Sequence, residues 1–442
     1  MRRPLCLVVL CGSIHVAAAA RADDAVVAGG ASVQQAIDAA PAGATVRLAA
    51  GTFAGRLTIT RPVTLEGPGW DRTFVEAGAT PKGHTDAEKL TFATALDGAA
   101  DERAQMGLIR AFLDRGGGAT VTVRGAARVT LRGVGVRGMA GSGRGGESLV
   151  SFADAADAHV VDCGLVGPAE DGIDVTDSSA VEVRHTLVAA VWGTGVSVDG
   201  SRGGGRAGSV HLVESDVRNC YYAGVRLGDD KASVVERCRI SGAAWHGIRY
   251  DDGAPTITGN LIFGNARCGI YASGATHATV RGNVFWRNEM SAISCWLANG
   301  DTIDRNTVVG NLEAGIAVLG DARPTVTRNV IAASPVGLAC NAVDGSGGNP
   351  RPAVADNLFW HDDADQTRMG KPDPLPAGNT DGDPHFAAAD RADFALPTDA
   401  AAGATDVLAV ASPWPVQAAE RAIIPDGETR DFSQWKKPAG VR

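Results

Sequence analysis

The sequence predicts an all-β solenoid, in which a short repeat is stacked into a parallel β-helix with 22–23 residues in each coil. Three observations predict this fold. A small residue followed by an apolar one recurs along the middle of the chain, and polar and apolar residues alternate around each pair. Glycine is abundant, at 57 residues, while valine, threonine and alanine dominate the same region. This composition and a period of two favour short strands joined by tight turns over helices.

The recurring pair sets the length of a coil. Its first members are separated by 23, 29, 23, 22, 23, 23 and 22 residues. The one long step contains the glycine-rich residues 201–206, which we interpret as a loop inserted into one coil. The pairs are Gly172-Ile173, Gly195-Val196, Gly224-Val225, Gly247-Ile248, Gly269-Ile270, Ala292-Ile293, Gly315-Ile316 and Gly337-Leu338.

Two further columns keep this period. Stacked strands lie about 4.8 Å apart, so each column becomes a ladder along the axis. We expect the asparagines in these ladders to be buried and to hydrogen-bond to one another and to turn backbone, a structural role rather than a ligand role. The first column is Cys163, His185, Ser215, Cys238, Asn260, Asn283, Asn306, Asn329 and Asn357, and the second is Cys220, Asn265, Asn288 and Asn311.

Three strands and three turns fit a coil of this length. Over about residues 31–361 the chain resembles the pectin lyase-like superfamily of right-handed parallel β-helix proteins. That superfamily includes pectate lyases, polygalacturonases and exported proteins with tandem β-helix repeats. The resemblance implies a right-handed solenoid, and it implies no single activity because this fold hosts many functions.

The N-terminus has the features of a cleaved secretory signal over residues 1–22. Arg2 and Arg3 precede an apolar stretch, and Ala20-Arg21-Ala22 forms a small-x-small cleavage site. We therefore expect a secreted or periplasmic protein. The signal holds three arginines and no acids, so the formal charge of −9 becomes −12 without it. With no basic stretch and no other long apolar run, we expect a monomer that binds neither nucleic acid nor a membrane.

We expect the β-helix to occupy residues 23–361. Ser32 and Gln35 have the spacing of a capping box, which predicts a short helix over the first coil. Residues 79–117 interrupt the repeat and are rich in helix formers, so we expect a helical excursion. We expect residues 362–442, which are rich in proline, to form an extended segment that folds back and caps the solenoid.

Six cysteines follow the signal, but the columns argue against disulfides. Cys163 and Cys238 share a column three coils apart. Cys295 and Cys340 share another two coils apart, which is about 9–10 Å and too far for a bridge. We expect buried thiols, and no spacing suggests a zinc site.

The residue after each inward apolar residue should point outward, and this column changes along the chain. It is charged or aromatic in early coils and small in late ones: Asp174, Ser197, Arg226, Arg249, Tyr271, Ser294, Ala317 and Ala339. Similar residues flank the early strands: Glu170, Asp171, Trp192, Tyr221, Tyr222, Trp245 and His246 before them, and Asp199, Asp229, Asp230, Lys231, Asp251 and Asp252 after them. We predict one long groove, between about Glu170 and Tyr271, for an extended polysaccharide.

The residue types favour an acidic, uronate-containing glycan. Aromatic rings give flat platforms for sugar rings, and arginine forks match sugar carboxylates. The candidate platforms are Trp192, Tyr222, Trp245 and Tyr271. The candidate catalytic residues are Asp171, Asp174, Arg226, His246, Arg249 and Lys231, and Ca²⁺ could be held by Asp199, Asp229, Asp230, Asp251 and Asp252.

Three functions stay open. Asp171-Gly172-Ile173-Asp174 and Trp245-His246-Gly247 resemble polygalacturonase segments, which would imply hydrolysis. However, Gly193-Thr194 stands where that family has paired aspartates, and His246 lies one coil too late.

Alternatively, a lyase or epimerase would use Arg226, Arg249 or Lys231 as base or neutralising cation. His246 or Tyr250 would then supply a proton, although strand parity turns Tyr250 inward. The third alternative is a non-catalytic binding or accessory protein.

Overall fold

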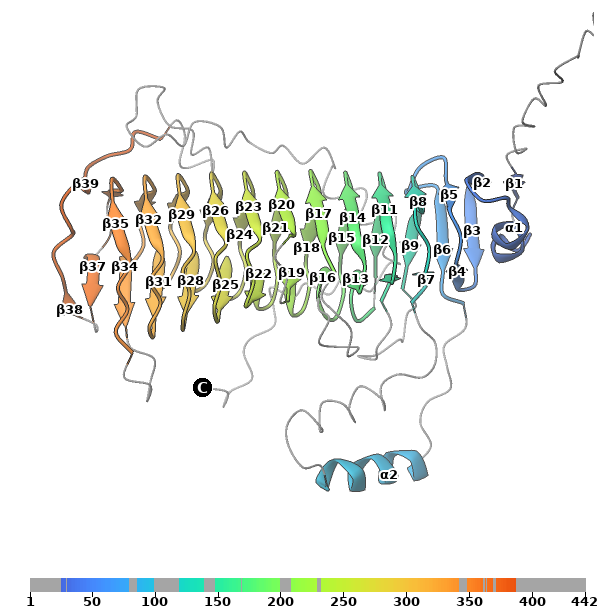
Figure 1. Ribbon diagram of the computed structural model, residues 1–442, viewed down its shortest axis with the longest axis horizontal. Coiled ribbons are helices and arrows are strands. Elements are labelled where there is room, and N and C mark those ends of the chain that lie inside the picture. Colours follow the sequence, from blue (N-terminus) through green and yellow to red (C-terminus); the bar gives the residue numbers. More distant parts are fainter. Residues whose placement is uncertain are drawn as a thin grey trace, which may run out of the picture.

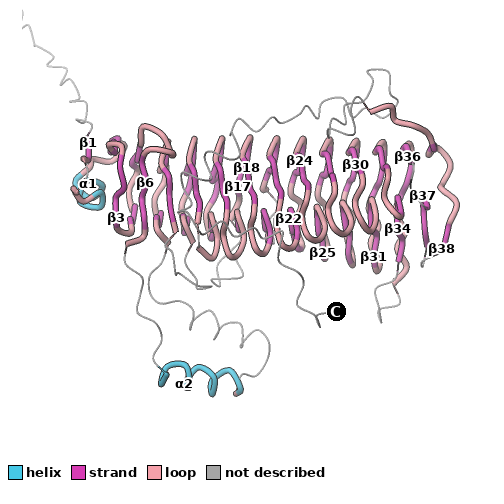
Figure 2. The backbone as a smooth tube through the Cα atoms, turned by 180° about the vertical axis from the view of Figure 1, so that it is seen from behind, coloured by secondary structure: helices cyan, strands magenta, loops and turns pink. Residues whose placement is uncertain are grey.

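The computed structural model describes residues 25–28, 30–78, 86–98, 119–138, 148–167, 169–198, 208–228, 232–341, 348–360, 362, 364–368 and 371–386. In this part of the chain, successive strands enter three long sheets in turn, which we call sheets A, B and C. The sheets wind around one axis as a parallel β-helix (Figure 1). Figure 2 shows the same coils from behind. The predicted plan of three strands per coil is confirmed.

Sheet A comprises β1 (Ala25–Val27), β2 (Ala44–Leu48), β5 (Val63–Glu66), β8 (Thr130–Arg132), β11 (Ala156–Val161), β14 (Ser179–Arg184), β17 (Val210–Val213), β20 (Val234–Glu236), β23 (Thr256–Thr258), β26 (Thr279–Arg281), β29 (Thr302–Asp304), β32 (Thr325–Thr327) and β35 (Ala353–Ala355). Sheet B comprises β3 (Gly51–Ala54), β6 (Thr73–Glu76), β9 (Gly135–Arg137), β12 (Gly164–Val166), β15 (Leu187–Ala189), β18 (Asp216–Arg218), β21 (Arg239–Ser241), β24 (Leu261–Phe263), β27 (Val284–Trp286), β30 (Thr307–Val309), β33 (Val330–Ala332), β36 (Leu358–Trp360) and β39 (Thr380–Asp381).

Sheet C comprises β4 (Leu57–Ile59), β7 (Val121–Arg124), β10 (Val150–Ala153), β13 (Ile173–Thr176), β16 (Val196–Val198), β19 (Ala223–Leu227), β22 (His246–Asp251), β25 (Ile270–Ser273), β28 (Ile293–Trp296), β31 (Ile316–Leu319), β34 (Val336–Asn341), β37 (Ala364–Arg368) and β38 (Lys371–Pro372). Neighbouring strands pair in parallel, except that β38 runs antiparallel to β37.

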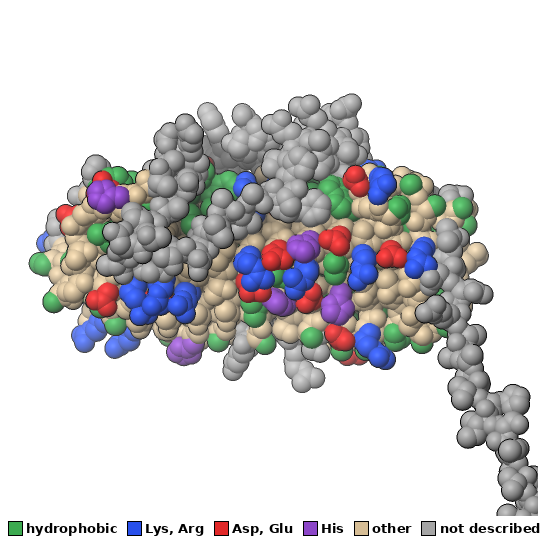
Figure 3. All heavy atoms as spheres, turned by 90° about the horizontal axis from the view of Figure 1, so that it is seen from above, with side chains coloured by type: hydrophobic (Ala, Val, Ile, Leu, Met, Phe, Trp, Pro, Cys, Tyr) green, Lys and Arg blue, Asp and Glu red, His purple; other side chains and the backbone are tan. Residues whose placement is uncertain are grey.

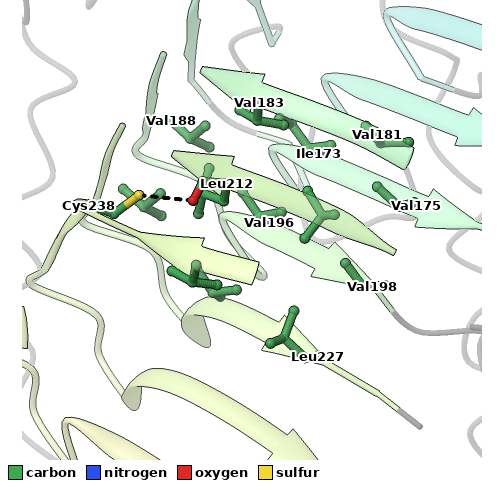
Figure 4. Packing of buried hydrophobic residues seen from close by; sticks show 14 of the residues in the cluster. Ile173, Val175, Val181, Val183, Val188, Val196, Val198, Leu212, Leu227 and Cys238 are labelled. Atoms are coloured by element: carbon green, nitrogen blue, oxygen red, sulfur yellow. Dashed lines mark hydrogen bonds between the residues drawn. The ribbon is translucent and has the colours of Figure 1, made fainter. Parts of the chain in front are cut away.

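Alternation of side chains builds the core. In β13, Ile173 and Val175 are buried, while Asp174 and Thr176 are partly exposed. The same period of two in the other sheets directs valine, isoleucine and leucine inward, and Figure 4 shows these side chains meeting inside the solenoid. Burial of each such side chain stabilises the fold by roughly 1.5–3 kcal/mol. Register is fixed because a slip of one residue would turn the whole apolar set outward.

The predicted asparagine ladder is confirmed at the turn between sheets A and B. Asn283 donates from Nδ2 to Asn306 Oδ1 at 3.0 Å and to the carbonyl oxygen of Ile257 at 2.9 Å. The ladder continues beyond Asn357 to Asn379, whose Oδ1 accepts from Asn357 Nδ2 at 2.9 Å. The second ladder is also present, with 2.8 Å between Asn265 Nδ2 and Asn288 Oδ1.

One member of the first column was wrong. Thr186, and not His185, occupies the ladder position, where its Oγ1 accepts from the Cys163 backbone N–H at 3.4 Å. His185 takes the preceding turn position with a φ of 47°, which turns its side chain outward. The short hydroxyl of Thr186 fits the buried ladder, whereas an imidazole there would crowd the stacked turns.

The N-terminal cap agrees with prediction. Helix α1 (Val33–Ala39) begins after Ser32, whose Oγ accepts from the Gln35 backbone N–H at 3.2 Å. A second helix, α2 (Asp86–Asp97), lies within the predicted excursion and stands apart from the coils in Figure 1. Neither of these described helices is long and apolar enough to cross a membrane. The proposed signal, most of the excursion and residues 387–442 lie outside the described residues.

The six cysteines of the coils are free and buried: Cys163, Cys220, Cys238, Cys268, Cys295 and Cys340. Burial raises the pKa of the Cys163 thiol to about 12, so it stays protonated and unreactive. The prediction of buried thiols instead of disulfides is confirmed.

Candidate binding and catalytic face

The outer face of sheet C carries the predicted outward column. Strand register places Asp174, Ser197, Arg226, Arg249, Tyr271, Ser294, Ala317 and Ala339 side by side on consecutive coils. Asp174, Arg226, Arg249 and Tyr271 are partly exposed, whereas Ser197 is buried. The charged and aromatic part of the column is therefore accessible in the early coils.

An oblique line of rings crosses this face, and we call it the aromatic row. It consists of Trp192, Tyr221, Tyr222, Trp245, His246, Tyr271 and Trp296. In its first half, the ring centroids of Trp192 and Tyr221 are 6.2 Å apart. Those of Tyr222 and Trp245 are 5.0 Å apart. These residues lie in the turns that precede β16, β19 and β22, so the row begins at a corner of the solenoid.

The second half of the row moves onto the strands. His246 stacks on Tyr271 with a centroid distance of 4.7 Å and an interplanar angle of 27°. Tyr271 lies 5.8 Å from Trp296, whose Nε1–H donates to Ser294 Oγ at 2.7 Å. Ring contacts thus link Tyr222 to Trp296 across four consecutive coils. The Trp192–Tyr221 pair extends the row by one coil, because Tyr221 and Tyr222 are adjacent in the chain.

Arg249 lies at the centre of the aromatic row. Its Nε donates to Asp251 Oδ2 at 3.0 Å and its Nη2 to Oδ1 at 3.2 Å, while Nη1 donates to the Tyr222 hydroxyl. Its guanidinium carbon is 5.4 Å from the Tyr271 ring centroid. Burial disfavours the charge, but the Asp251 carboxylate, together with Tyr222 and Tyr271, outweighs burial and raises the pKa of Arg249. Arg249 is therefore a fixed cation.

His246 is held as a neutral imidazole. It is 4% exposed, and its Nδ1 accepts from the Cys268 backbone N–H at 3.3 Å. This acceptor role assigns the proton to Nε2. Burial, followed by the charges of Arg267 and Arg249, lowers the pKa of His246 to about 3. The ring can donate from Nε2 at neutral pH, but it does not act there as an imidazolium acid.

Asp171 has a structural environment. It is 2% exposed, and its Oδ1 accepts from the Thr194 backbone N–H at 2.6 Å. A Cβ at Gly193 would come within 2.6 Å of the same oxygen, so glycine is needed there. The carboxylate therefore fastens two adjacent turns together, while Asp174 lies partly exposed on β13.

The remaining predicted residues have three different outcomes. Arg226 lies next to Arg249 in the column. Asp252 is not directed to the Arg249 cluster, since its Oδ1 accepts from the Ala275 backbone N–H at 2.7 Å. Among the residues that the structure describes, no three His, Cys, Asp or Glu side chains gather as a metal site. Lys231, Asp199, Asp229 and Asp230 lie outside the described residues.

Two aromatic-row features were missed in the sequence. Trp296 is in register with Ser273 and, one coil earlier, Asp251. Trp296 lies two residues after the outward Ser294 on β28, so the alternation of side chains along the strand also predicts that it points outward. Arg267 lies with its guanidinium carbon 3.9 Å from the Trp245 ring centroid. It belongs to a corner turn, where parity gives no direction.

Comparison with known proteins bears on the fold. The family model of the right-handed β-helix region matches residues 117–285 and 171–331. No curated protein sequence matches the chain.

Among solved structures, the A-module of the mannuronan C-5 epimerase AlgE6 from Azotobacter vinelandii is similar, with a TM-score of 0.56 and 14% identity over 79% of this chain and 93% of the module. The Dettilon tailspike protein gives a TM-score of 0.42 and 13% identity over 77% of this chain and 62% of the tailspike. Pectate lyase Pel9A gives a TM-score of 0.38 and 14% identity over 83% of this chain and 82% of the lyase.

Proposed function

We propose that the aromatic row of this right-handed parallel β-helix binds an extended acidic polysaccharide. The observation that carries the proposal is the row of rings across five coils, with a fixed arginine at its centre. Similarity to the epimerase concerns the fold, so the ligand class rests on these side chains. A groove along this face remains part of the proposal.

Sugar rings suit the row because each aromatic face offers a flat apolar surface beside polar atoms. The rings already pack on one another, so ligand binding orders few side chains and loses little conformational entropy. At about 4.8 Å per coil, the row from Trp192 to Trp296 spans about 19 Å, which requires an extended ligand rather than a single sugar.

The acidic character of the ligand follows from Arg249. A guanidinium has five N–H groups, and its bonds to Asp251 and Tyr222 use three of them. Two N–H groups remain to bind a sugar carboxylate as a fork. Arg226 on the preceding coil and Arg267 beside Trp245 add positive charge to the same face.

The chemistry that this centre favours is proton transfer beside a uronate carboxylate, either β-elimination or epimerisation. Arg249 would neutralise the carboxylate, which makes the proton on the adjacent carbon removable. The proposed base is the Tyr222 oxygen, which Arg249 Nη1 holds: as a phenolate it would accept that proton, and as a phenol it would return it. In elimination the neighbouring C–O bond then breaks, its electron pair stays on the leaving sugar oxygen, which takes up a proton, and a C=C double bond remains. In epimerisation no C–O bond breaks, and water delivers a different proton to the same carbon from the opposite face.

Hydrolysis is less well supported. It needs an acid and a base carboxylate flanking the glycosidic bond. Asp171 is buried and bound to the Thr194 backbone, and Gly193-Thr194 stands where the polygalacturonases have their paired aspartates. We therefore assign Asp171 to positioning the turn, not to acid–base chemistry. Ca²⁺ binding would depend mainly on Asp199, Asp229 and Asp230 and is kept as a variable in the assay.

A direct test incubates the full chain with polygalacturonate and alginate, with and without Ca²⁺. New ultraviolet absorbance identifies unsaturated ends from a lyase, and proton NMR of the polymer identifies epimerisation. We expect one of the two signals, and we expect binding to both acidic polymers to exceed binding to dextran. Binding without either signal would replace the enzyme by the non-catalytic alternative. Equal binding to dextran would contradict the acidic ligand.

Export is the second part of the proposal. It rests on the signal features of residues 1–22. Expression of the full sequence in a bacterial host should give periplasmic or extracellular protein whose N-terminal residue is Asp23. Recovery of intact protein in the cytoplasmic fraction would contradict export.

A further inference from the structure

A second charged surface lies on sheet A, away from the aromatic row. Three arginines surround one carboxylate there, and we call Arg281, Arg305, Arg328 and Asp304 the basic patch. Asp304 Oδ2 is 2.6 Å from Arg305 Nη1 and 3.6 Å from Arg281 Nε, and its Oδ1 is 2.7 Å from Arg328 Nε. The four groups carry a net charge of about +2, in a chain whose formal charge is −9.

The arginines of the basic patch come from successive coils of the solenoid. Arg281 and Asp304 are register partners on β26 and β29. Arg305 and Arg328 occupy equivalent turn positions, since each precedes a ladder asparagine and has a φ of 53° or 55°. Three consecutive coils therefore each contribute one guanidinium to the same edge of the solenoid, about 4.8 Å apart along the axis.

The arginines remain accessible although they contact Asp304. The exposed fractions of the side chains are 54% for Arg281, 27% for Arg305 and 43% for Arg328, against 6% for Asp304. The positive groups thus lie outermost. Figure 3 shows Lys and Arg side chains gathered in one blue group toward the left of this face, apart from a mixed group over the middle coils.

The charged residues in the turns that follow β14, β17 and β20 of sheet A differ from the basic patch. Glu214 accepts from Arg237 Nε at 3.1 Å and lies 2.7 Å from His185 Nε2, and Glu236 lies 3.0 Å from Arg237 Nη1. In those turns the acidic side chains are about as many as the basic side chains that they contact. In the basic patch Asp304 is outnumbered, and the next acid in the turn column, Asp356, lies one coil beyond Arg328.

A row of hydroxyls runs beside the basic patch. Thr279, Thr302 and Thr325 are register partners, and each is the exposed first residue of its strand. Each of the three coils therefore presents one threonine hydroxyl and one guanidinium. A polyuronate strand presents hydroxyls and one carboxylate on every sugar, so a strand that lies along the axis complements this pattern.

We propose that the basic patch and its threonine row form a second binding surface for an acidic polysaccharide, separate from the aromatic row. The ligand class rests on the proposed function, whereas the surface rests on its own charges and register. This surface would anchor a distant part of a long polymer, or a neighbouring chain, while the aromatic row holds another part. Simultaneous engagement raises the affinity for polymers over that for short oligosaccharides.

Titration calorimetry of the full chain with polygalacturonate tests the proposal. Arg281→Gln removes the most exposed guanidinium, which is the one least tied to Asp304, and we expect roughly 3- to 5-fold weaker binding. Asp304→Asn raises the charge of the patch, and we expect tighter binding by a similar factor. Arg47→Gln is the matched control, because Arg47 lies on the same sheet near its N-terminal end, 3.1 Å from Glu66. Thermal unfolding verifies that each variant is folded.

The outcomes separate the two surfaces. Equal affinities for Arg281→Gln, Asp304→Asn and Arg47→Gln would overturn the basic patch as a ligand surface, and its arginines would then serve only to neutralise Asp304. Tyr271→Ala tests the aromatic row independently. If Tyr271→Ala binds like wild type while Arg281→Gln is weakened, the proposed function of the aromatic row fails and the basic patch stands. A wild-type chain that binds no polyuronate would overturn both.

Discussion

The guanidinium carbon of Arg249 lies 5.4 Å from the ring centroid of Tyr271, its register partner on the following coil. This contact links the charged column of sheet C to the aromatic row. The same guanidinium is held by Asp251 and bonded to the Tyr222 hydroxyl, so the cation and the flanking rings are fixed before a ligand arrives. Such preorganisation is what a site for a charged, flexible polymer needs, because little ordering cost remains on binding.

Replacing Arg249 by lysine keeps the charge and removes the planar fork. We expect about 10-fold weaker binding of polygalacturonate, because an ammonium cannot hold Asp251 and a sugar carboxylate in the same geometry. Calorimetry measures the change. Arg239→Lys is the control, since Arg239 makes a similar contact, 4.8 Å from the Phe263 ring centroid, on sheet B. Equal affinities of the two variants would show that the fork is irrelevant.

Tyr222→Phe removes one hydroxyl and keeps the ring that packs on Trp245. If this oxygen transfers the proton, turnover of polyuronate should fall by about 100-fold while the dissociation constant changes less than 2-fold. Steady-state assays and calorimetry on one preparation give both numbers. Tyr221→Phe, one residue away in the same row, should retain wild-type turnover. Loss of binding in step with turnover would assign Tyr222 to the platform alone.

His246 should make the fold sensitive to acid. Its pKa is about 3 when folded and near 6.5 when unfolded. Between these values only the unfolded chain binds the proton, so stability falls as the pH drops through this window. Of the stability lost between pH 7 and pH 4, about 3 kcal/mol should come from this residue.

Urea unfolding at the two pH values measures this effect. His246→Gln should show a smaller shift of the unfolding midpoint than wild type, whereas the exposed His277→Gln should shift as wild type does. Identical shifts in all three chains would mean that His246 is not held neutral.

Asn306 tests the ladder that stacks the coils. It donates to Asn329 Oδ1 and to the Val280 carbonyl oxygen at 2.9 Å, and it accepts from the Asn283 backbone N–H at 3.0 Å. Asn306→Ala leaves these buried groups unsatisfied, and we expect a loss of about 3 kcal/mol in unfolding free energy. Chemical denaturation with Thr279→Ala as the exposed control measures it. A loss below that of the control would contradict a stabilising ladder.

The coils could be predicted from the sequence because a strand alternates its side chains and a solenoid repeats each position. The same rules gave the outward column from Asp174 to Ala339. They failed at corners. A Cβ on Gly172 would come within 2.3 Å of Val188 Cγ1, so the chain turns its corner residues inward just before β13. Parity counted back from Ile173 therefore fails at Gly172, although it would have placed Asp171 inward, where this residue is 2% exposed.

Turns explain the other gaps as well. The steps of 23 and 29 between the recurring pairs lead from Cys163 to Thr186 and Ser215, so the prediction of His185 was one residue off. The left-handed φ of His185 turns its side chain out of the ladder. The bond between Arg249 and Tyr222 joins a strand to a turn on the preceding coil, residues that are 27 apart in sequence. A periodic pattern specifies which residues share a column, but it does not specify which side chains reach across from a corner.

The central claim is that an extended acidic chain lies along the aromatic row, and affinity as a function of oligosaccharide length tests it most directly. Calorimetry with oligogalacturonates of increasing length should show the affinity rising until the ligand covers the row, about 19 Å, and then rising much less. Tyr271→Ala should flatten this rise. Affinities that do not depend on length, or an unchanged length dependence in Tyr271→Ala, would contradict the account.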